Sequence, residues 1–433
     1  MRLKYYNKSK WFTGIIVMVA AMFAISCAHT PAYKKKQVSK TAQEILSNPN
    51  NLAICYGGYR EKSRDIEPTI AEIKDDMKIL AAMDIKLIRT YNVYLQETAN
   101  LLEAITQLKQ ENSDFEMYVM LGAWIDCKDA RTEKPDHANE SEQNAGEIDR
   151  AIALASKYPD IVKILAVGNE AMVKWAASYY VEPNIILKWV NYLQNLKKQG
   201  KLPATLWITS SDNFASWGGG GSEYHVEDLN QLIKAVDFIS MHTYPMHDTH
   251  YNPDFWGVRE SEANLSDLEK IDAAMLRAKN YSVAQYQNVV KYMKSIGVEK
   301  PVHIGESGWA TQSNEHYGNS GSRATDEYKS ALYYKHTRDW TQKAGLICFY
   351  FEAFDEQWKD AENPAGSENH FGLINLQSQA KYALWSAVDA GKFKGLTRNG
   401  KPITKTYKGN KTALLQDVKV PPSDLEIKEL KKH

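Results

Sequence analysis

The sequence predicts a closed α/β barrel of eight parallel strands. Between Leu52 and about Leu384, short apolar runs rich in β-branched and aromatic residues alternate with longer stretches of helical character. Eight such runs can be counted, which is the number that closes a (β/α)8, or TIM, barrel. An open, doubly wound sheet is the competing architecture, but no Gly-x-Gly-x-x-Gly turn follows the first run.

The eight predicted strands are spread along the chain from residue 52 to residue 351. Each is bounded by polar or turn-forming residues and is short enough for a buried parallel strand. They are Leu52–Tyr56, Lys86–Tyr91, Glu116–Leu121, Val162–Val167, Thr205–Thr209, Val236–Met241, Pro301–Gly305 and Gly345–Phe351.

The stretches between these runs have the periodicity of amphipathic helices. From Thr69 to Met83 the apolar residues Ile70, Ile73, Met77 and Leu80 repeat at helical spacing. Similar patterns predict helices over Thr98–Leu108, Ala145–Lys157 and Asp326–Lys343.

Composition excludes some partners and leaves others open. The 433 residues contain 53 Lys plus Arg and 53 Asp plus Glu, so no net charge draws the chain to nucleic acid. The 25 Tyr and 11 Trp suit a groove for hydroxyl-rich ligands as well as they suit an ordinary core.

The N-terminus has the pattern of an export signal. Four basic residues precede an apolar stretch, Trp11–Ile25, that is short for a membrane span. The small residues before Cys27 resemble a bacterial lipoprotein cleavage box, in which that cysteine is lipidated; a plain signal anchor is the alternative. We therefore expect a cell-envelope lipoprotein, on the periplasmic side or at the cell surface, that contacts the membrane only through this anchor. The expected parts are a signal peptide (1–27), a linker (28–50), the (β/α)8 barrel domain (51–390) and a C-terminal tail (391–433).

Three further cysteines, Cys55, Cys127 and Cys348, have no short spacing. They form neither a disulfide framework nor a zinc motif. Each lies in or beside an apolar run, so buried free thiols are expected, although a closed barrel could bring Cys55 and Cys348 close enough for a bridge.

Residues just after each strand are the candidates for a site, because barrel chemistry collects at the carboxyl ends of the strands. These positions are rich in polar and aromatic groups, which is the composition of a carbohydrate groove. They include Tyr56, Tyr91-Asn92, Trp124, Asn169-Glu170, Ser210–Asn213, His242–Tyr244, Glu306–Trp309 and Glu352–Glu356.

Two glutamates at these ends suggest glycoside hydrolysis. Glu170 follows the fourth predicted strand and Glu306 the seventh, so they can face each other across the barrel mouth. One carboxylic acid would protonate the leaving oxygen while the other attacks or stabilises the sugar, with a separation near 5 Å, roughly, for retention. Asn169 is placed to hold a sugar 2-hydroxyl. For a lone glutamate, helix capping or pairing with lysine would be the default explanation.

The sequence resembles the family 17 glycoside hydrolases, the β-1,3-glucanases, from Asn51 to about Leu384. The motifs that carry the resemblance are Val167-Gly168-Asn169-Glu170, Ile304-Gly305-Glu306-Ser307-Gly308-Trp309 and Phe351–Lys359, the last being closer to fungal and bacterial members than to plant ones. The resemblance implies that Glu170 is the acid/base and Glu306 the nucleophile, with neither cofactor nor metal. Ala310 stands where the family usually has proline, and His303 where it has an apolar residue.

The remaining expected substrate-binding residues are less firmly placed. Tyr244 matches a tyrosine that contacts the nucleophile, and Tyr91, Asn92 and Trp309 match residues that line the sugar. A charged group after the last strand matches a cluster beside the site, in which Glu352 orients neighbours or binds ligand. His242 is expected on the sugar-binding rim. The full expected set is Tyr56, Tyr91, Asn92, Trp124, Asn169, His242, Tyr244, Trp309, Glu352, Asp355, Glu356 and Lys359.

Three other stretches allow more than one interpretation. His242, His247, Asp248 and His250 could suggest a metal, but their spacing matches no tight motif. The segment from 245 to 280 is either a cap that extends the groove or a solvated insertion. The glycines at 218–221 are expected in a flexible groove loop, and the basic tail is expected to pack partly on the barrel and then fray.

Together these features predict a lipid-anchored, extracytoplasmic glycosidase that cleaves β-1,3-glucan with retention. A transglycosylase with the same catalytic pair is one alternative, and a noncatalytic surface glycan-binding lipoprotein is another. The sequence leaves open internal or terminal cleavage, tolerance of β-1,6 branches, the membrane that holds the anchor, and the oligomeric state.

Overall fold

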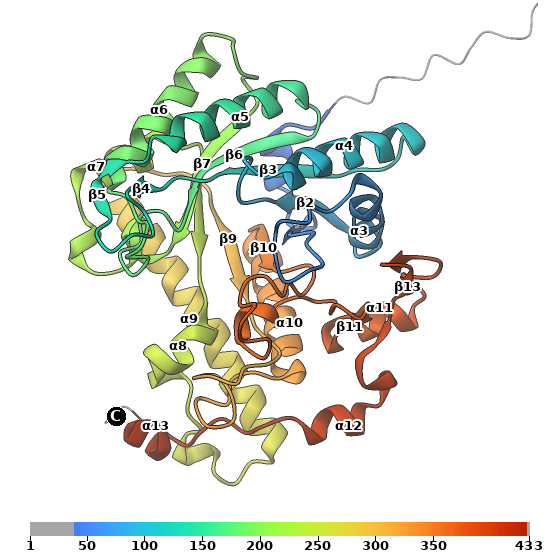
Figure 1. The fold of residues 1–433 in the computed structure, drawn as a ribbon. Coiled ribbons are helices and arrows are strands. Elements are labelled where there is room, and N and C mark those ends of the chain that lie inside the picture. Colours follow the sequence, from blue (N-terminus) through green and yellow to red (C-terminus); the bar gives the residue numbers. More distant parts are fainter. Residues whose placement is uncertain (1–38, 431–433) are drawn as a thin grey trace, which may run out of the picture. The chain divides into compact units, whose positions relative to one another are not determined.

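The computed structural model describes residues 39–430 and contains the predicted barrel (Figure 1). Eight parallel strands close in the order β1-β10-β9-β8-β7-β6-β3-β2. Closure is made by β1 and β10, with Ala53 opposite Phe349 and Ile54 opposite Tyr350. The strands are β1 (Leu52–Cys55), β2 (Ile85–Arg89), β3 (Tyr118–Ala123), β6 (Val162–Asn169), β7 (Trp207–Asn213), β8 (Ile239–His242), β9 (Val302–Gly308) and β10 (Cys348–Phe351).

Crossover helices connect the strands, and several carry strong N-terminal caps. Thr69 and Ser266 form capping boxes with glutamates three residues on, and the Asp326 side chain accepts from the Lys329 N–H. The helices are α3 (Ile70–Ala82), α4 (Gln96–Glu111), α5 (Gln143–Lys157), α6 (Pro183–Lys198), α7 (Glu227–Ala235), α9 (Asp267–Ser295) and α10 (Glu327–Ala344). Because they run antiparallel to the strands, their C-termini lie at the amino-terminal face of the barrel.

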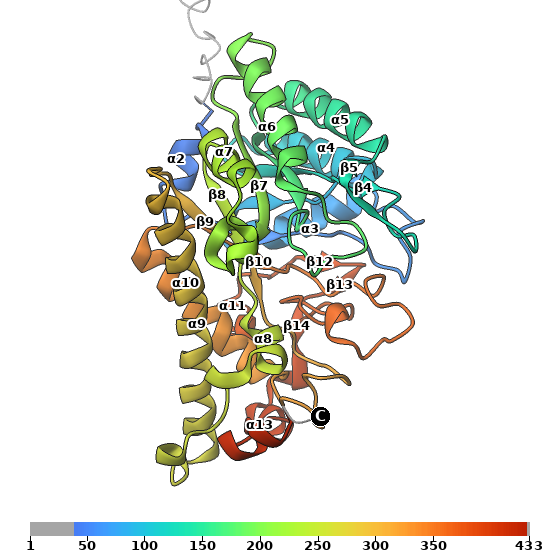
Figure 2. The ribbon, with the colours of Figure 1, turned by 90° about the vertical axis from the view of Figure 1, so that its left-hand side faces the viewer.

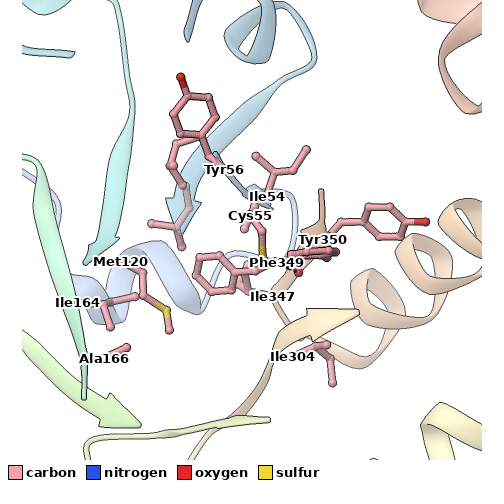
Figure 3. Close-up of a cluster of buried hydrophobic side chains, with 14 of the residues drawn as sticks. Ile54, Cys55, Tyr56, Met120, Ile164, Ala166, Ile304, Ile347, Phe349 and Tyr350 are labelled. Carbon is pink, nitrogen blue, oxygen red and sulfur yellow. Dashed lines mark hydrogen bonds between the residues drawn. The ribbon is translucent and has the colours of Figure 1, made fainter. Parts of the chain in front are cut away.

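The barrel interior is a packed apolar core. Met120, Ile164 and Phe349 come from different strands and are fully buried within it (Figure 3). Filled barrels of this kind leave the strand ends as the place for chemistry. The three cysteines from Cys55 onward are free and buried, so the bridge considered between Cys55 and Cys348 is absent from the described residues.

A short N-terminal helix, α2 (Ala42–Leu46), packs on the amino-terminal side of the barrel. Ala42, Ile45 and Leu46 are buried, and Lys40 forms an ion pair of 2.5 Å with Glu116, just before β3. Residues from 40 onward form one compact unit that includes this helix.

The loops at the carboxyl ends carry most of the additional structure. After β3 comes a hairpin, β4 (Cys127–Lys128) and β5 (Asp136–Glu140). After β8 come α8 (Pro245–Tyr251), η3 (Pro253–Phe255) and η4 (Glu260–Glu262) before α9, so the segment from 245 to 280 is largely helical. The glycines at 218–221 do not form an open loop: η1 (Ala215–Gly219) is a π-helical turn in which Trp217 is fully buried, followed by η2 (Ser222–Tyr224).

The chain after β10 wraps back along the barrel (Figures 1 and 2). Arg398 is fully buried and its Nε donates to Asp76 of α3 at 3.0 Å. Residues 391–430 therefore pack on the barrel over much of their length. The elements here are η5 (Ser367–Asn369), β11 (Gln379–Ala380), η6 (Tyr382–Leu384), α11 (Trp385–Asp389), β12 (Thr397–Arg398), β13 (Lys401–Pro402), β14 (Thr404–Lys405), η7 (Thr406–Gly409), α12 (Lys411–Gln416) and α13 (Asp424–Leu430).

Among residues 39–430, no helix combines the length and apolar character needed to cross a membrane. The predicted signal peptide and Cys27 lie outside the described residues.

Candidate active site

A groove of about 1420 Å³ crosses the carboxyl-terminal face of the barrel. Both predicted catalytic glutamates line it, Glu170 from the end of β6 and Glu306 from β9. Polar and aromatic side chains from the other strand ends make up much of the remaining wall. The groove thus occupies the place at which barrel enzymes perform their chemistry.

Glu306 is held as a carboxylate. It is 5% exposed, its Oε1 accepts from the Arg89 guanidinium, and its Oε2 accepts from the Tyr244 hydroxyl at 2.7 Å. Burial alone would raise the pKa of this carboxyl, but the Arg89 charge and these two hydrogen bonds hold it below its ordinary value. Glu306 is therefore ionised and oriented, as a nucleophile must be.

Glu170 is held in the opposite state. Burial, followed by the charges of Glu306 and Asp212, raises its pKa well above the ordinary value. Its backbone adopts φ +46°, in the left-handed region that few residues other than glycine use, and its N–H donates to Ser211 O at 3.0 Å. The bend turns the side chain into the groove as β6 ends, so a protonated carboxyl faces the ionised one.

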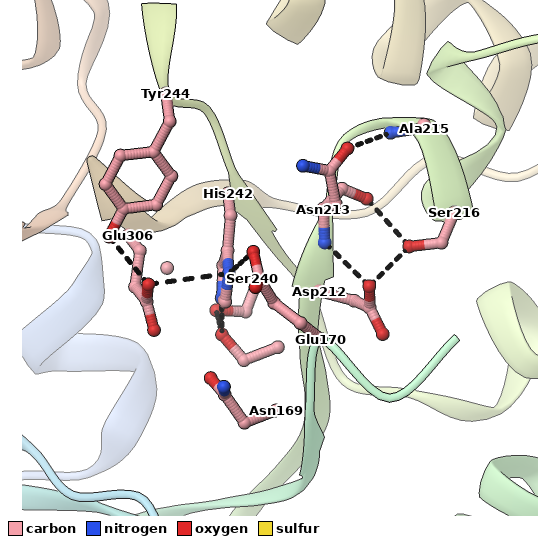
Figure 4. Close-up of polar contacts among 12 residues, drawn as sticks. Asn169, Glu170, Asp212, Asn213, Ala215, Ser216, Ser240, His242, Tyr244 and Glu306 are labelled. Atoms are coloured by element: carbon pink, nitrogen blue, oxygen red, sulfur yellow. Dashed lines mark hydrogen bonds and ion pairs between the residues drawn. The ribbon is translucent and has the colours of Figure 1, made fainter. Parts of the chain in front are cut away.

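His242 lies between the two glutamates (Figure 4). Its Nδ1 is 3.1 Å from Glu170 Oε1 and 3.7 Å from Glu306 Oε2, and its Nε2 is 2.8 Å from Ser211 Oγ. Burial lowers the pKa of the imidazole to about 3, so it is neutral at the pH at which most enzymes work. A neutral imidazole can position both carboxyl groups without forming an ion pair with either of them.

Arg89, at the end of β2, belongs to the site although the sequence reasoning missed it. It is 1% exposed, and besides Glu306 it donates to Asn169 Oδ1 at 2.6 Å and to Gly305 O at 3.1 Å. One guanidinium thus joins the nucleophile to the asparagine beside the acid. An arginine at the end of an apolar run was the signal, because a charge buried in a strand needs a partner.

Asp212 supports the turn that carries Glu170. It is fully buried and accepts from the Asn213 N–H at 2.7 Å and the Ser216 hydroxyl at 2.6 Å (Figure 4). It also accepts from the Met172 N–H at 2.7 Å. Burial raises its pKa to about 6. The sequence placed Asp212 only within Ser210–Asn213, among the polar residues at the strand ends.

Most of the predicted substrate-binding residues do line the groove. They are Tyr56, Tyr91, Asn92, Trp124, Asn169, Tyr244, Glu356 and Lys359. The hydroxyl of Tyr56 is directed to Asp76 at 3.0 Å, and Trp124 Nε1 donates to Asp126 at 2.7 Å. Tyr56 is also only 1% exposed, so of these two residues only the half-buried Trp124 ring is accessible to a ligand.

Four predicted residues lie behind the groove wall. His242 is buried between the glutamates. Trp309 is fully buried, packs near Trp256 and Tyr333, and donates to Ala324 O at 2.8 Å. Glu352 is 1% exposed and pairs with Lys359 at 2.5 Å, which fits the orienting role expected of it.

Asp355 is the fourth of these residues. It accepts from Lys381 at 2.7 Å and from the Gly372 N–H at 2.9 Å, so it binds the chain that follows β10. Trp309 and Asp355 were expected in the site because they follow strands. The position of a residue after a strand does not determine the direction in which its side chain points.

Three large aromatic residues on the groove wall are unusually exposed. Trp175 is 63%, Tyr94 51% and Tyr251 64% exposed, and each comes from a loop after a different strand. None was singled out as a binding residue from sequence, although Tyr251 lies in the segment from 245 to 280 that was considered as a cap on the groove. Exposed aromatic rings in a polar groove are suited to stacking on sugar rings.

The histidines after β8 do not converge. His247 stacks on Tyr244, whereas His250 stacks on His316. Within residues 39–430 there is no group of three His, Cys, Asp or Glu side chains that could hold a metal ion.

A closed barrel with a protonated and an ionised glutamate facing one groove has the fold and site of a glycoside hydrolase. Comparison with known families agrees, because the BtgE/BtgC glycoside hydrolase domain matches residues 53–372. The chain belongs to that family.

Several solved or curated proteins are similar to the chain. A crystal structure of an endo-laminarinase from Formosa Hel1_33_131 is 64% identical, has a TM-score of 0.88, and is matched over 89% of this chain and 98% of that one. The "Probable glucan endo-1,3-beta-glucosidase btgC" of Aspergillus terreus is 22% identical over 364 residues, 80% of this chain and 47% of its own length. The chain thus spans less than half of that curated relative. A beta-1,3-glucanosyltransferase of Rhizomucor miehei, 19% identical over 78% of this chain and 97% of that one with a TM-score of 0.54, shares the fold.

Proposed function

We propose that the chain is a retaining endo-β-1,3-glucanase that acts on laminarin-like β-glucan. The proposal rests on one observation: a protonated Glu170 and an ionised Glu306 both approach the same imidazole nitrogen of His242. Glu170 Oε1 and Glu306 Oε2 lie 3.1 and 3.7 Å from this nitrogen, so the two oxygens can be at most about 7 Å apart. That limit falls at the lower edge of the range for inverting enzymes, about 6.5–9.5 Å, and so favours the shorter separation of retaining ones.

In the first half of the proposed reaction, the Glu306 carboxylate attacks the anomeric carbon and forms a glycosyl ester. Glu170 gives its proton to the glycosidic oxygen as the bond to the leaving sugar breaks. Tyr244 and Arg89 orient the attacking carboxylate, and Asn169, itself held by Arg89, is placed to bind a sugar hydroxyl.

In the second half, Glu170 has lost its proton and acts as the base. It removes a proton from water, the water oxygen attacks the anomeric carbon, and the ester to Glu306 breaks. The first half lowers the charge on Glu306, so the repulsion that had raised the Glu170 pKa falls and Glu170 remains ionised for this step.

The substrate class is supported by similarity and by the shape of the site. The relative that is 64% identical bears the name endo-laminarinase. The groove continues along the barrel face in this chain, with Trp358 and Trp175 on loops after different strands. An open groove accepts the middle of a polysaccharide, which favours internal cleavage.

The test is a time course on laminarin with product sizing, together with proton NMR of the first product anomer. A retaining endo-glucanase releases β-anomers and intermediate oligosaccharides early. Products longer than the substrate would identify a transglycosylase. An α-anomer would refute retention. If the parent protein binds laminarin but never cleaves a β-glucan, the enzyme proposal is wrong and a glycan-binding lipoprotein remains.

Glu306→Gln is the matched variant for this test. It keeps the shape of the side chain but removes the nucleophile, so we expect hydrolysis to fall by roughly 10⁴-fold or more while laminarin binding persists. Glu315→Gln, in a loop outside the groove, serves as the control for the same chemical change.

We also propose that the protein is a cell-envelope lipoprotein attached through Cys27. The support is the basic, apolar and small-residue pattern that precedes this cysteine. In cells fed a labelled fatty acid, the protein should carry label and fractionate with membranes, and Cys27→Ser should abolish both. An unlabelled, soluble protein would refute the proposal.

A further inference from the structure

The amino-terminal face of the barrel, opposite the groove, is strongly basic. Six crossover helices end there with lysine in the last turn. Five of those lysines, and Lys201 in the turn after α6, are exposed and form no ion pair within residues 39–430; we call these six residues the lysine face. They are Lys157, Lys198, Lys201, Lys234, Lys294 and Lys343.

Most of the carboxylates on this side do not cancel the charge, because other lysines already pair with them. Asp84 pairs with Lys392, Glu111 with Lys74, Glu116 with Lys40, and Asp237 with Lys197. Asp114, Asp160 and Glu299 are the other acidic residues in the turns that lead into β3, β6 and β9. The lysine face therefore keeps an excess of positive charge.

The groove has the opposite balance. Even without Glu97 and Glu170, whose raised pKa values keep them protonated, acidic side chains outnumber basic ones on its wall: Asp126, Glu147, Asp248, Glu306, Glu356 and Glu368 against Arg64, Arg131, Arg150 and Lys359. With 53 charges of each sign the chain is neutral overall, yet its charge is divided between two opposite faces. Such a molecule is oriented by a negatively charged surface even though it has no net charge.

We propose that the lysine face rests on the anionic headgroups of a lipid bilayer and that the groove points away from it. A lysine at a helix C-terminus also complements the helix dipole, and this alone would explain why each of these helices ends with a lysine. Two observations favour a surface: Lys201 lies outside any helix, and the described chain enters at this same face, where Lys40 pairs with Glu116 and α2 packs.

The choice of a bilayer over another polyanion rests on the proposed anchor. Cys27 precedes Lys40 by about a dozen residues, which even when fully extended reach roughly 45 Å. A lipid on Cys27 would keep this face within that distance of the membrane. Each lysine near an anionic bilayer adds to the attraction within a Debye length, about 8 Å at physiological salt.

The test uses residues 39–433, which contain the whole compact unit, and vesicles of phosphatidylcholine with or without phosphatidylglycerol. We expect cosedimentation with the anionic vesicles only, weakening as salt increases. Lys157→Gln/Lys198→Gln/Lys234→Gln, with one change on each of α5, α6 and α7, should weaken it by about tenfold or more.

The matched control is Lys62→Gln/Lys134→Gln/Lys401→Gln. It removes the same charge from exposed positions in or next to loops on the groove side. Its binding should stay within about twofold of the parent. On bound vesicles, hydrogen exchange should slow at the C-terminal turns of α5, α6 and α7 and stay unchanged at 171–181 beside the groove.

Three results would overturn the proposal. One is the absence of binding at low salt, and another is equal loss in the two triple variants. The third is equally tight binding of a soluble polyuronate through the same lysines, which would identify a general polyanion surface. None of these measurements depends on glucanase activity, so the two proposals fail separately.

Discussion

At the residue scale, Asp212 shows how a buried side chain sets the protonation of another. Its charge raises the pKa of Glu170, and its oxygens hold the Met172 N–H of the turn after Glu170. We predict that Asp212→Asn lowers the Glu170 pKa, so the basic limb of the kcat/KM profile moves to lower pH. Loss of one acceptor should also reduce kcat by about tenfold.

The measurement is the pH dependence of laminarin cleavage for both proteins. Asp248→Asn is the control, because Asp248 also lines the groove but bonds to Asn252 and Gln285. If Asp212→Asn reduces kcat but leaves the basic limb in place, Asp212 supports the turn without tuning the acid.

Glu97 leads to a prediction about stability. Burial and then the charge of Glu356 raise its pKa to about 8 from 4.5, so the folded chain keeps a proton that the unfolded chain releases. Stability must then fall as pH rises from about 4.5 to 8, because unfolding releases a proton in that window. We predict that Glu97→Gln removes this slope, and that its melting temperature relative to the parent increases between pH 5 and pH 8.

Thermal unfolding at several pH values checks this expectation, with the exposed Glu133→Gln as the control. A difference between parent and Glu97→Gln that is independent of pH would show that Glu97 releases its proton at its ordinary pKa.

The placement of Glu170 and Glu306 in one groove could be predicted from sequence, whereas the residues that contact them could be predicted only in part. Glu170 and Glu306 follow buried strands, and the barrel rule fixes where strand ends meet. Arg89 could have been found from sequence, because it is a charged residue at the end of an apolar run. Asp212 and Glu97 carried none, because their effect depends on loops whose paths are set by packing. Trp309 was predicted to line the groove but is buried, because a residue at a strand end can also face the core.

At the element scale, the barrel strands were predicted in number and order, but β3, β6, β7, β8 and β9 end later than expected, whereas β1 and β2 end earlier. Ser210–Asn213 and Glu306–Gly308 were expected beyond their strands and belong to β7 and β9. An apolar-run criterion ends a strand at its first polar residue. At the barrel mouth, however, polar residues stay in the ladder because neighbours satisfy them, as Ser211 does with Ser240 and His242.

The C-terminal hairpin of β12 and β13 is joined to α3 by a buried ion pair. Asp76 accepts from Arg398, from Arg60 at 3.0 Å and from Tyr56 at 3.0 Å. We predict that Arg398→Met destabilises the fold by about 3 kcal/mol, because it leaves a buried carboxylate with one cation fewer and ends the contact of the guanidinium with Phe354.

Denaturant unfolding of Arg398→Met, Asp76→Asn and the double variant measures the coupling. The double variant should lose less than the two single losses together, since it removes the charge that Arg398→Met leaves unpaired. Additive losses would mean that Arg398 stabilises the hairpin by packing alone.

At the scale of the whole molecule, the balanced total charge does not reveal that the fold places basic and acidic residues on opposite faces. Equal numbers of basic and acidic residues argued against an acidic partner, but the sequence does not state that helix ends gather lysines on one face while strand ends gather carboxylates on the other. The charges of six helices add up only because all of them end on the same side of a closed barrel. Charge balance therefore has to be judged face by face.

The length of the groove leads to the last prediction. Trp175 lines the groove on the loop directly after Glu170. In the proposed reaction Glu170 protonates the oxygen of the leaving sugar, so we expect this exposed ring to lie on the leaving side. Stacking on a sugar there contributes about 1 kcal/mol or more, which is roughly fivefold in affinity. Trp175→Ala should therefore raise KM for laminarin by about that factor.

An aryl glucoside-type substrate whose leaving group is too short to reach Trp175 should keep its kcat/KM in the same variant. Transfer to added laminari-oligosaccharides should fall together with laminarin binding, because an acceptor uses the leaving side of the groove. Tyr192→Ala, an exposed aromatic outside the groove, is the control and should change neither. If Trp175→Ala slows both substrates alike, the ring supports the Glu170 turn instead of the polysaccharide.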